Sequence, residues 1–189
     1  MAEIRCSCEN EPNSSDDNSD ESCIFCRIIN GDEPYTQILA EDEDIICFED
    51  IYPAAPHHYL VIPKKHIHSC LSLQADDIGL VRRMAEMGRD VLRAKGVKDF
   101  EDISLGFHVP PFITVPHLHL HVLAPFSQIF KRSEEKFTSF WYQTEERFLH
   151  ELAKKKTSYK CMQIYKAISR WPQLLRRPFP KITALSLLL

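Results

Sequence analysis

Short runs of apolar residues, many of them β-branched or alternating with polar residues, follow one another in the first third of the chain. Residues 36–41 and 44–50 flank a polar turn at Asp42-Glu43, and a third run extends from His58 to Ile62 before Pro63. Runs of this length bounded by turn residues are typical of β-strands. The pattern therefore predicts three successive strands.

Two other segments place their apolar residues at helical spacing. A short one runs from Cys23 to Ile29 and ends at Asn30-Gly31, a common helix C-terminus. A longer one covers residues 73–95 and is closed by Gly96. Its apolar positions repeat every three or four residues: Ile78, Val81, Met84, Met87, Val91 and Leu92. With a further strand predicted from Ile103 to Val109, the chain reads as an α+β fold, a mainly antiparallel sheet with one long helix packed on it.

The segment between Pro116 and Pro125 has an unusual polar pattern, with three of the chain's nine histidines within five residues. Successive side chains of a strand point to opposite faces. His117, His119 and His121 would therefore share one face, and the residues that alternate with them would form a buried face: Leu118, Leu120 and Val122. A helix would scatter the imidazoles. We predict a strand with one apolar face and one histidine face.

Three interpretations fit such a face. The histidines can be ordinary polar residues satisfied by their neighbours, they can bind a metal ion, or they can catalyse nucleophilic attack. Residues i and i+4 of a strand lie about 13 Å apart, from a rise of ~3.3 Å per residue, whereas Zn–N bonds measure only ~2.1 Å. One ion shared by all three is therefore disfavoured. We favour a central imidazole that attacks an electrophile while its neighbours orient it and handle protons.

Composition divides the chain into three parts. Residues 1–22 hold seven acidic side chains, one arginine and a single large apolar residue, which predicts a disordered segment. Residues 23–152 carry the predicted elements, and 44% hydrophobic residues overall suffice for a core. From Leu152 onward there are nine Lys or Arg and no acid, so residues 153–189 form a basic tail. An acidic domain beside a basic tail argues against general nucleic-acid binding by the domain.

The basic tail has one amphipathic stretch. Four apolar residues approximate a helical face before Pro172: Met162, Tyr165, Ile168 and Trp171. Such a face suits a calmodulin target or a helix on an anionic membrane surface, but we favour a disordered tail. No run of about 18 apolar residues predicts a membrane span. The absence of an apolar leader, together with seven cysteines in no disulfide-like spacing, favours a cytoplasmic protein, with the nucleus as a further location.

Four stretches of the sequence together resemble one protein family. The run His117-Leu118-His119-Leu120-His121-Val122-Leu123 is similar to the signature of the histidine triad superfamily of nucleotide hydrolases and transferases, and most similar to its Hint branch. The segments 58–66, 48–51 and 23–29 resemble the strand, ribose-binding turn and N-terminal segment of the same proteins. The resemblance covers residues 22–152. It implies hydrolysis of purine nucleoside phosphoramidates and acyl adenylates, an adenosine 5'-monophosphoramidase activity that needs no cofactor for catalysis.

The resemblance also implies roles for individual residues. His119 occupies the position of the nucleophile, which forms a covalent nucleotidyl-histidine intermediate. His121 and His58 match the residues that contact the phosphate and support the attack. Thr114 stands where the Hint branch has a hydroxyl near the leaving group, with Thr in place of Ser, while Ile113 departs from the amide side chain of the best-known members.

The nucleotide site is implied by the same match. Asp50 would accept hydrogen bonds from the ribose hydroxyls. Five apolar residues could form a slot for a purine, or belong to the ordinary core: Ile24, Phe25, Ile28, Phe48 and Ile51. The chain has no glycine-rich phosphate loop that would hold the nucleotide in another way.

Cys23 and Cys26 form a C-x-x-C pair, which alone is a weak motif. With His66 and His117 it makes a Cys₂His₂ set at positions that some branches of the superfamily use for structural zinc. The alternative is two half-buried thiols without a metal.

Other activities and assemblies remain open at this stage. Branches that hydrolyse dinucleoside polyphosphates or cap remnants share the triad, and a regulatory module that only binds nucleotides is a further alternative. The resemblance implies a homodimer or larger homo-oligomer. The aromatic-rich residues 128–152 would then contact the other subunit, or form a helix that covers the same core.

Overall fold

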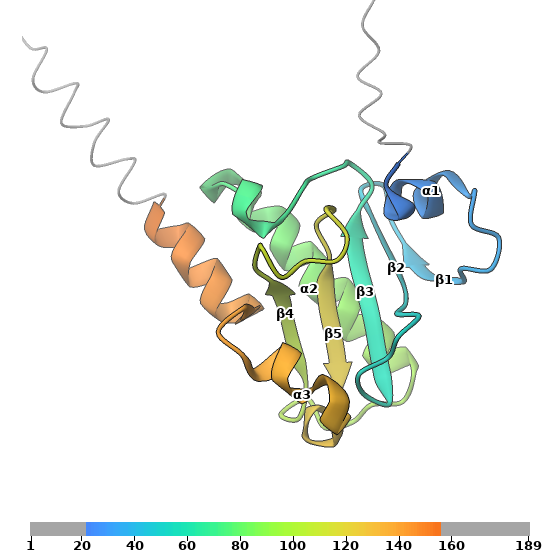
Figure 1. Ribbon diagram of the computed structural model, residues 1–189, viewed down its shortest axis with the longest axis vertical. Coiled ribbons are helices and arrows are strands. Elements are labelled where there is room, and N and C mark those ends of the chain that lie inside the picture. The colour runs from blue at the N-terminus through green and yellow to red at the C-terminus, as the bar shows by residue number, and fades with distance from the viewer. Residues whose placement is uncertain (1–21, 156–189) are drawn as a thin grey trace, which may run out of the picture.

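A computed structural model describes residues 22–155 of the chain. A single six-stranded sheet forms its centre, in the order β1-β2-β3-β5-β4-β6 (Figure 1). Every neighbouring pair is antiparallel. The strands are β1 (Ile38–Glu41), β2 (Ile45–Glu49), β3 (His57–Pro63), β4 (Ser104–His108), β5 (Leu120–Ala124) and β6 (Tyr142–Thr144). The predicted α+β class with an antiparallel sheet is confirmed.

The long helix α2 (Ile78–Ala94) packs on one face of the sheet. Its apolar stripe, which includes Val81, Met84 and Leu92, is buried against the strand residues that point to that side. The helix ends as predicted, because Gly96 adopts the left-handed conformation (φ 86°) that terminates helices. It begins later than predicted, since short 3₁₀ turns at Cys70–Ser72 and Ala75–Asp77 precede it.

Two shorter helices cover the opposite face of the sheet. The helix α1 (Ile24–Asn30) lies over β2 and β3, where Phe25 packs against Phe48. The helix α3 (Lys131–Thr138) lies near the other end of the same face and buries Phe137 against Leu123 (Figure 1). The sheet is thus covered by α2 on one side and by α1 and α3 on the other.

The histidine segment differs in part from the predicted strand. Strand β5 begins at Leu120, so His117 and His119 lie in the chain that leads into it. The ladder with β3 ends where Val61 pairs with Leu120. Before that point the N–H of Leu118 donates to the carbonyl of Ile67, at 2.6 Å, instead of to a strand. The predicted division of faces is nevertheless right, because Leu120 and Val122 join the core under α2 while His121 lies on the opposite face.

The region after α3 contains more structure than the pattern predicted. It forms the edge strand β6 and a helix over residues 145–155, which runs through the predicted domain boundary at 152. Phe148 and Leu152 of this helix are buried in the core on the α2 side. The region therefore covers the core, one of the two alternatives expected for it.

The predictions for the two ends of the chain lie mostly outside the described residues. The acidic segment predicted to be disordered covers residues 1–22, of which the structure describes only residue 22, and the basic tail covers 153–189, of which it describes only 153–155. The predicted apolar face of Met162, Tyr165, Ile168 and Trp171 therefore lies outside the described residues. Among residues 22–155, no helix is both long enough and apolar enough to cross a membrane.

Candidate active site

The backbone carbonyl of His117 holds the His119 ring in a defined tautomer. Its Nδ1 lies 2.6 Å from the carbonyl oxygen of His117, and a carbonyl can only accept, so Nδ1 carries the proton. The other nitrogen, Nε2, therefore keeps its lone pair. Burial lowers the pKa of His119 from 6.5 to about 4, which keeps the ring neutral at cellular pH. A neutral imidazole with a fixed tautomer is suited to nucleophilic attack through Nε2.

His58 and His121 form a buried pair beside His119. His58 Nε2 lies 2.9 Å from His121 Nδ1, and the N–H of Ala54 donates to His58 Nδ1 at 3.0 Å. The antiparallel register of β3 and β5 brings the two residues together, because His121 pairs with Leu60. Burial lowers the pKa of His58 to about 3 and holds that of His121 well below 6.5. The ring centres of His119 and His121 are 5.0 Å apart, so the three predicted histidines share one site.

A fourth histidine, His108, belongs to the same cluster and was not predicted. It ends β4, and its Nδ1 lies 3.0 Å from Nε2 of His121. Gly106 pairs with His121, so continuing that register by two residues places His108 beside His119. The sequence alone predicted the strand but not its register with the histidine segment, because eleven residues of irregular chain separate β4 from β5.

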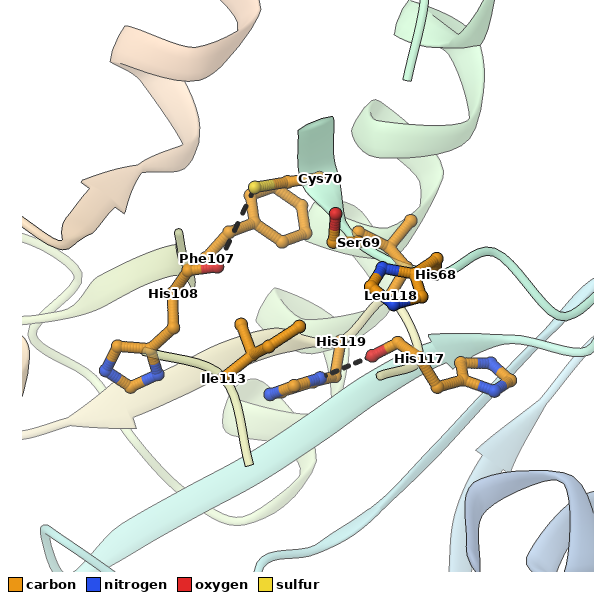
Figure 2. A pocket seen from close by; sticks show the side chains of 9 residues that line it. All are labelled: His68, Ser69, Cys70, Phe107, His108, Ile113, His117, Leu118 and His119. Atoms are coloured by element: carbon orange, nitrogen blue, oxygen red, sulfur yellow. Dashed lines mark hydrogen bonds between the residues drawn. The ribbon is translucent and has the colours of Figure 1, made fainter. Parts of the chain in front are cut away.

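A small cavity opens beside His119 (Figure 2). His108, His119 and Ile113 contribute to its lining, and the Ile113 side chain lies between the two imidazoles in this view. Ile113 belongs to the loop that joins β4 to the histidine segment. Thr114 follows it in this loop and is exposed to solvent, so its hydroxyl is available to a bound molecule.

The residues predicted to bind the nucleotide fall into two groups. Asp50 and Phe25 reach the histidines: Asp50 Oδ2 lies 3.4 Å from His58 Nε2, and the Phe25 ring packs edge-on to His119 with centres 5.4 Å apart. Burial raises the pKa of Asp50, although the N–H of Tyr52 donates to its carboxylate.

The other four members of the predicted apolar slot differ in how far they are buried. Phe48 is buried in the core beneath α1, and Ile28 packs half-buried against the same cluster. Ile24 and Ile51 are exposed, Ile51 by 82%. Phe48 is thus a core residue, whereas the two exposed isoleucines offer apolar surface to solvent.

Cys23, Cys26, His66 and His117 converge at the junction of α1 and the histidine segment. Their sulfur and ring nitrogen atoms all lie within 4.8 Å of one another. His117 Nδ1 lies 3.5 Å and 3.7 Å from the sulfurs of Cys23 and Cys26, and His66 Nδ1 lies 3.3 Å from Cys26. A tetrahedral zinc ion would space sulfur and nitrogen ligands by about 3.6 Å, given Zn–S near 2.3 Å and Zn–N near 2.1 Å. These four residues therefore fit a zinc ion.

The tautomer of His117 agrees with that fit. Its Nε2 donates to the carbonyl oxygen of Pro63 at 2.9 Å, which leaves the lone pair of Nδ1 facing the two cysteines. The neighbouring trio of His108, His119 and His121 also brings ring nitrogens together, within 4.8 Å. Both nitrogens of His121 are already hydrogen-bonded to other imidazoles, so this trio is a poor ligand set.

Comparisons with known proteins identify the family to which a chain with this site belongs. The family described as "Scavenger mRNA decapping enzyme C-term binding" matches residues 22–136. A HIT family hydrolase from Clostridium thermocellum has a similar solved structure, with 33% identity, 55% of this chain and 90% of that chain covered, and a TM-score of 0.50. A histidine triad protein from Clostridium difficile matches with 31% identity over 55% of this chain and 90% of that one, with a TM-score of 0.51.

The chain belongs to the histidine triad superfamily. Within the superfamily it is similar to two proteins called adenosine 5'-monophosphoramidase HINT3. The Danio rerio protein is 64% identical over 157 residues, which are 83% of this chain and 98% of that protein. The Mus musculus protein is 45% identical over 140 residues, 72% of this chain and 85% of the relative. The predicted membership of the superfamily and of its Hint branch is confirmed.

Proposed function

We propose that this histidine triad protein is an adenosine 5'-monophosphoramidase, which hydrolyses the P–N bond of AMP-amide and AMP-lysine conjugates and the mixed anhydride of acyl adenylates. The observation that carries the proposal is the state of His119, a neutral imidazole whose Nδ1–H is bound to a carbonyl and whose Nε2 keeps its lone pair. The names of the similar Danio rerio and Mus musculus proteins support the same activity.

The reaction proceeds in two displacements at phosphorus. Nε2 of His119 forms a bond to the α-phosphorus while the P–N bond of the substrate breaks, and the departing amine takes up a proton from solvent, which the water of the second step returns. Water then attacks the nucleotidyl-histidine, the P–Nε2 bond breaks, and AMP leaves with the imidazole restored. His121 and His58 stabilise the charge that develops on the phosphoryl oxygens, and the resemblance to the Hint branch assigns the exposed Thr114 hydroxyl to the leaving group.

The nucleoside is held by Asp50 and by apolar contacts. The Asp50 carboxylate accepts hydrogen bonds from the ribose hydroxyls, close to His58. The Phe25 ring and the exposed side chains of Ile24 and Ile51 contact the purine. We propose purine nucleotides as substrates on this basis, a homodimer or larger homo-oligomer as the assembly, and the cytoplasm and nucleus as the location.

A substrate panel tests the proposal. The purified protein is assayed with AMP-lysine, AMP-amide, diadenosine polyphosphates and cap dinucleotides, and kcat/KM should be highest for the two phosphoramidates. Preference for a polyphosphate or a cap dinucleotide would contradict the proposal and support a related hydrolase. AMP binding with negligible turnover of all four would instead identify a nucleotide-binding regulatory module.

We further propose that Cys23, Cys26, His66 and His117 bind one structural zinc ion that is not required for the chemical step. The proposal is supported by the ligand spacing and by the free Nδ1 lone pair of His117. Two thiolates, one from the residue before α1 and one from its first turn, and two imidazoles from the β3–β5 side would tie the N-terminal helix to the histidine segment. Because such a site forms only in the folded chain, binding of the ion would stabilise the fold.

A further inference from the structure

Three imidazoles stand in a row between a backbone donor and a backbone acceptor. The row begins at the N–H of Ala54 and passes through His58, His121 and His108, with contacts of 3.0, 2.9 and 3.0 Å. It ends at the carbonyl oxygen of Lys136, 3.1 Å from Nε2 of His108. Each contact joins one nitrogen of a ring to the next group, so both nitrogens of all three rings are engaged.

The two ends of the row fix every proton in it. A peptide N–H can only donate, so Nδ1 of His58 is an acceptor and the neutral ring carries its proton on Nε2. That proton is donated to Nδ1 of His121, which must then carry its own proton on Nε2 and donate it to Nδ1 of His108. His108 in turn donates from Nε2 to a carbonyl, which can only accept. If the hydrogen bonds ran in the opposite direction, a peptide N–H would have to accept at one end and a carbonyl would have to donate at the other. The three neutral rings therefore have only one possible set of tautomers.

The helix α3 closes this row from one side. Lys136 supplies the terminal carbonyl, and the next residue, Phe137, is buried with its ring centre 5.5 Å from that of His58, 5.1 Å from His121 and 4.9 Å from His108. This apolar ring restricts the imidazoles to their hydrogen-bonded orientations. It also keeps the site poorly solvated, which favours the neutral rings.

We propose that His108 is a positioning residue, which holds the Nε2–H of His121 in place beside His119 as a donor for the phosphoryl oxygen of the substrate. One ring nitrogen of each of His108, His119 and His121 lies within 4.8 Å of the other two, and the ring centres of His119 and His121 are 5.0 Å apart. The held proton therefore belongs to a ring that packs against His119. When the phosphoryl group arrives, its oxygen replaces Nδ1 of His108 as the acceptor. The donor is then already oriented before charge develops, which is the condition for effective transition-state stabilisation. The catalytic part of this inference rests on the proposed phosphoramidase activity, whereas the tautomers do not.

Two substitutions separate positioning from packing. In His108→Leu no acceptor remains for the His121 proton. In His108→Asn the side-chain Oδ1 is bonded to Cγ, as Nδ1 is in histidine, and can accept that proton. His57→Leu serves as the control for loss of a nearby histidine, because His57 is bound to the Tyr59 hydroxyl and lies outside the row. Side-chain ¹⁵N spectra of the wild-type protein at pH 7 report the tautomers without any substrate.

We expect the wild-type spectra to show His58, His121 and His108 as neutral Nε2–H tautomers. His108→Leu should lower kcat for AMP-amide by about 10- to 100-fold, the range seen when a partner that orients a metal-binding histidine is removed, with little change in KM. His108→Asn should recover most of that loss, and His57→Leu should behave as wild type.

Three results would overturn the inference. One is a wild-type His121 with its proton on Nδ1. The others are a folded His108→Leu protein that keeps its kcat within about twofold, and a folded His108→Asn protein as slow as the leucine variant. If the wild-type protein hydrolyses no phosphoramidate, the proposed function fails, but the tautomers are still decided by the spectra.

Discussion

The histidines of this site are distinguished by the partner of their second nitrogen. His117 binds the carbonyl of Pro63 through Nε2, which leaves Nδ1 for the cysteine pair. His119 binds a carbonyl through Nδ1, which leaves Nε2 for chemistry. His121 has both nitrogens bound to imidazoles and so acts as a fixed donor. Residues of one type, spaced two apart, are therefore suited to the three different roles proposed for them, because their backbone and ring partners differ.

The proposed zinc site predicts the metal content and the stability of the protein. Protein purified without chelators should contain about one zinc per chain, and Cys23→Ser combined with Cys26→Ser should abolish it. Stability should fall by several kcal/mol, because the free energy of metal binding contributes to folding. Metal analysis and urea unfolding measure the two effects.

The control for this prediction is Cys70→Ser, which changes a buried thiol outside the four residues and should retain the zinc. Wild-type protein without metal, or zinc that persists in the double variant, would refute the proposed ligand set.

At the scale of elements, α2 approaches the sheet closely at one glycine. A Cβ built on Gly88 would lie 2.6 Å from Cγ2 of Val122 in β5, well inside van der Waals contact. The valine side chain is buried and branched, so it cannot move aside without displacing core residues. Gly88→Ala should therefore destabilise the protein by about 1–3 kcal/mol, as overpacking of a core does. Chemical denaturation measures the change.

Gly79 provides a matched control in the same helix. A Cβ at Gly79 would meet nothing within 4 Å, so Gly79→Ala should stabilise the protein by about 0.5–1 kcal/mol through helix propensity. If the two substitutions had equal effects on stability, the close contact between α2 and β5 would be disproved.

The elements also show what the sequence could and could not predict. Helical spacing and short apolar runs, bounded by residues typical of turns and helix ends, located α1, α2 and the first four strands. The same signals missed β6, whose three residues are too few for a periodic pattern. They also placed His117 inside a strand, because alternation continues through residues that leave the ladder.

The site was predicted to a similar extent. His58, His119 and His121 could be found because the family resemblance covers their segments. His108 could not, because its place depends on the register between β4 and β5, and Phe137 could not, because α3 reaches the histidines only in the folded chain. Contacts between distant segments carry no local sequence pattern.

At the scale of the whole molecule, the buried histidines make stability depend on pH. Burial lowers the pKa of His58 to about 3 and that of His121 well below 6.5, whereas in the unfolded chain both return to about 6.5. Between these values the unfolded state binds more protons than the folded state. The contribution of these two histidines to the free energy of unfolding should therefore be fully present above about pH 6.5. It should decrease as the pH falls toward 3, by up to about 1.4 kcal/mol per pH unit for each histidine.

Urea unfolding at pH 7.5, 6.5 and 5.5 measures this dependence. His58→Asn keeps an acceptor for the Ala54 N–H but does not titrate, so it should reduce the slope below pH 6.5 without abolishing it, because His121 still titrates. His150→Gln, at an exposed position of the last described helix, is the control for loss of a histidine outside the buried cluster. Stability that is constant or rises on acidification would contradict the neutral state of the buried histidines.

The covalent role of His119 is tested most directly by trapping the intermediate. Enzyme is quenched during turnover of a slow substrate, such as an adenosine phosphorothioate ester, and digested for mass spectrometry. The nucleotidyl adduct should map to His119, because its Nε2 is the lone pair left free beside the cavity. His119→Ala should form no adduct, lose turnover by several orders of magnitude and still bind AMP. An adduct on another residue, or near-normal kcat in the alanine variant, would contradict the mechanism.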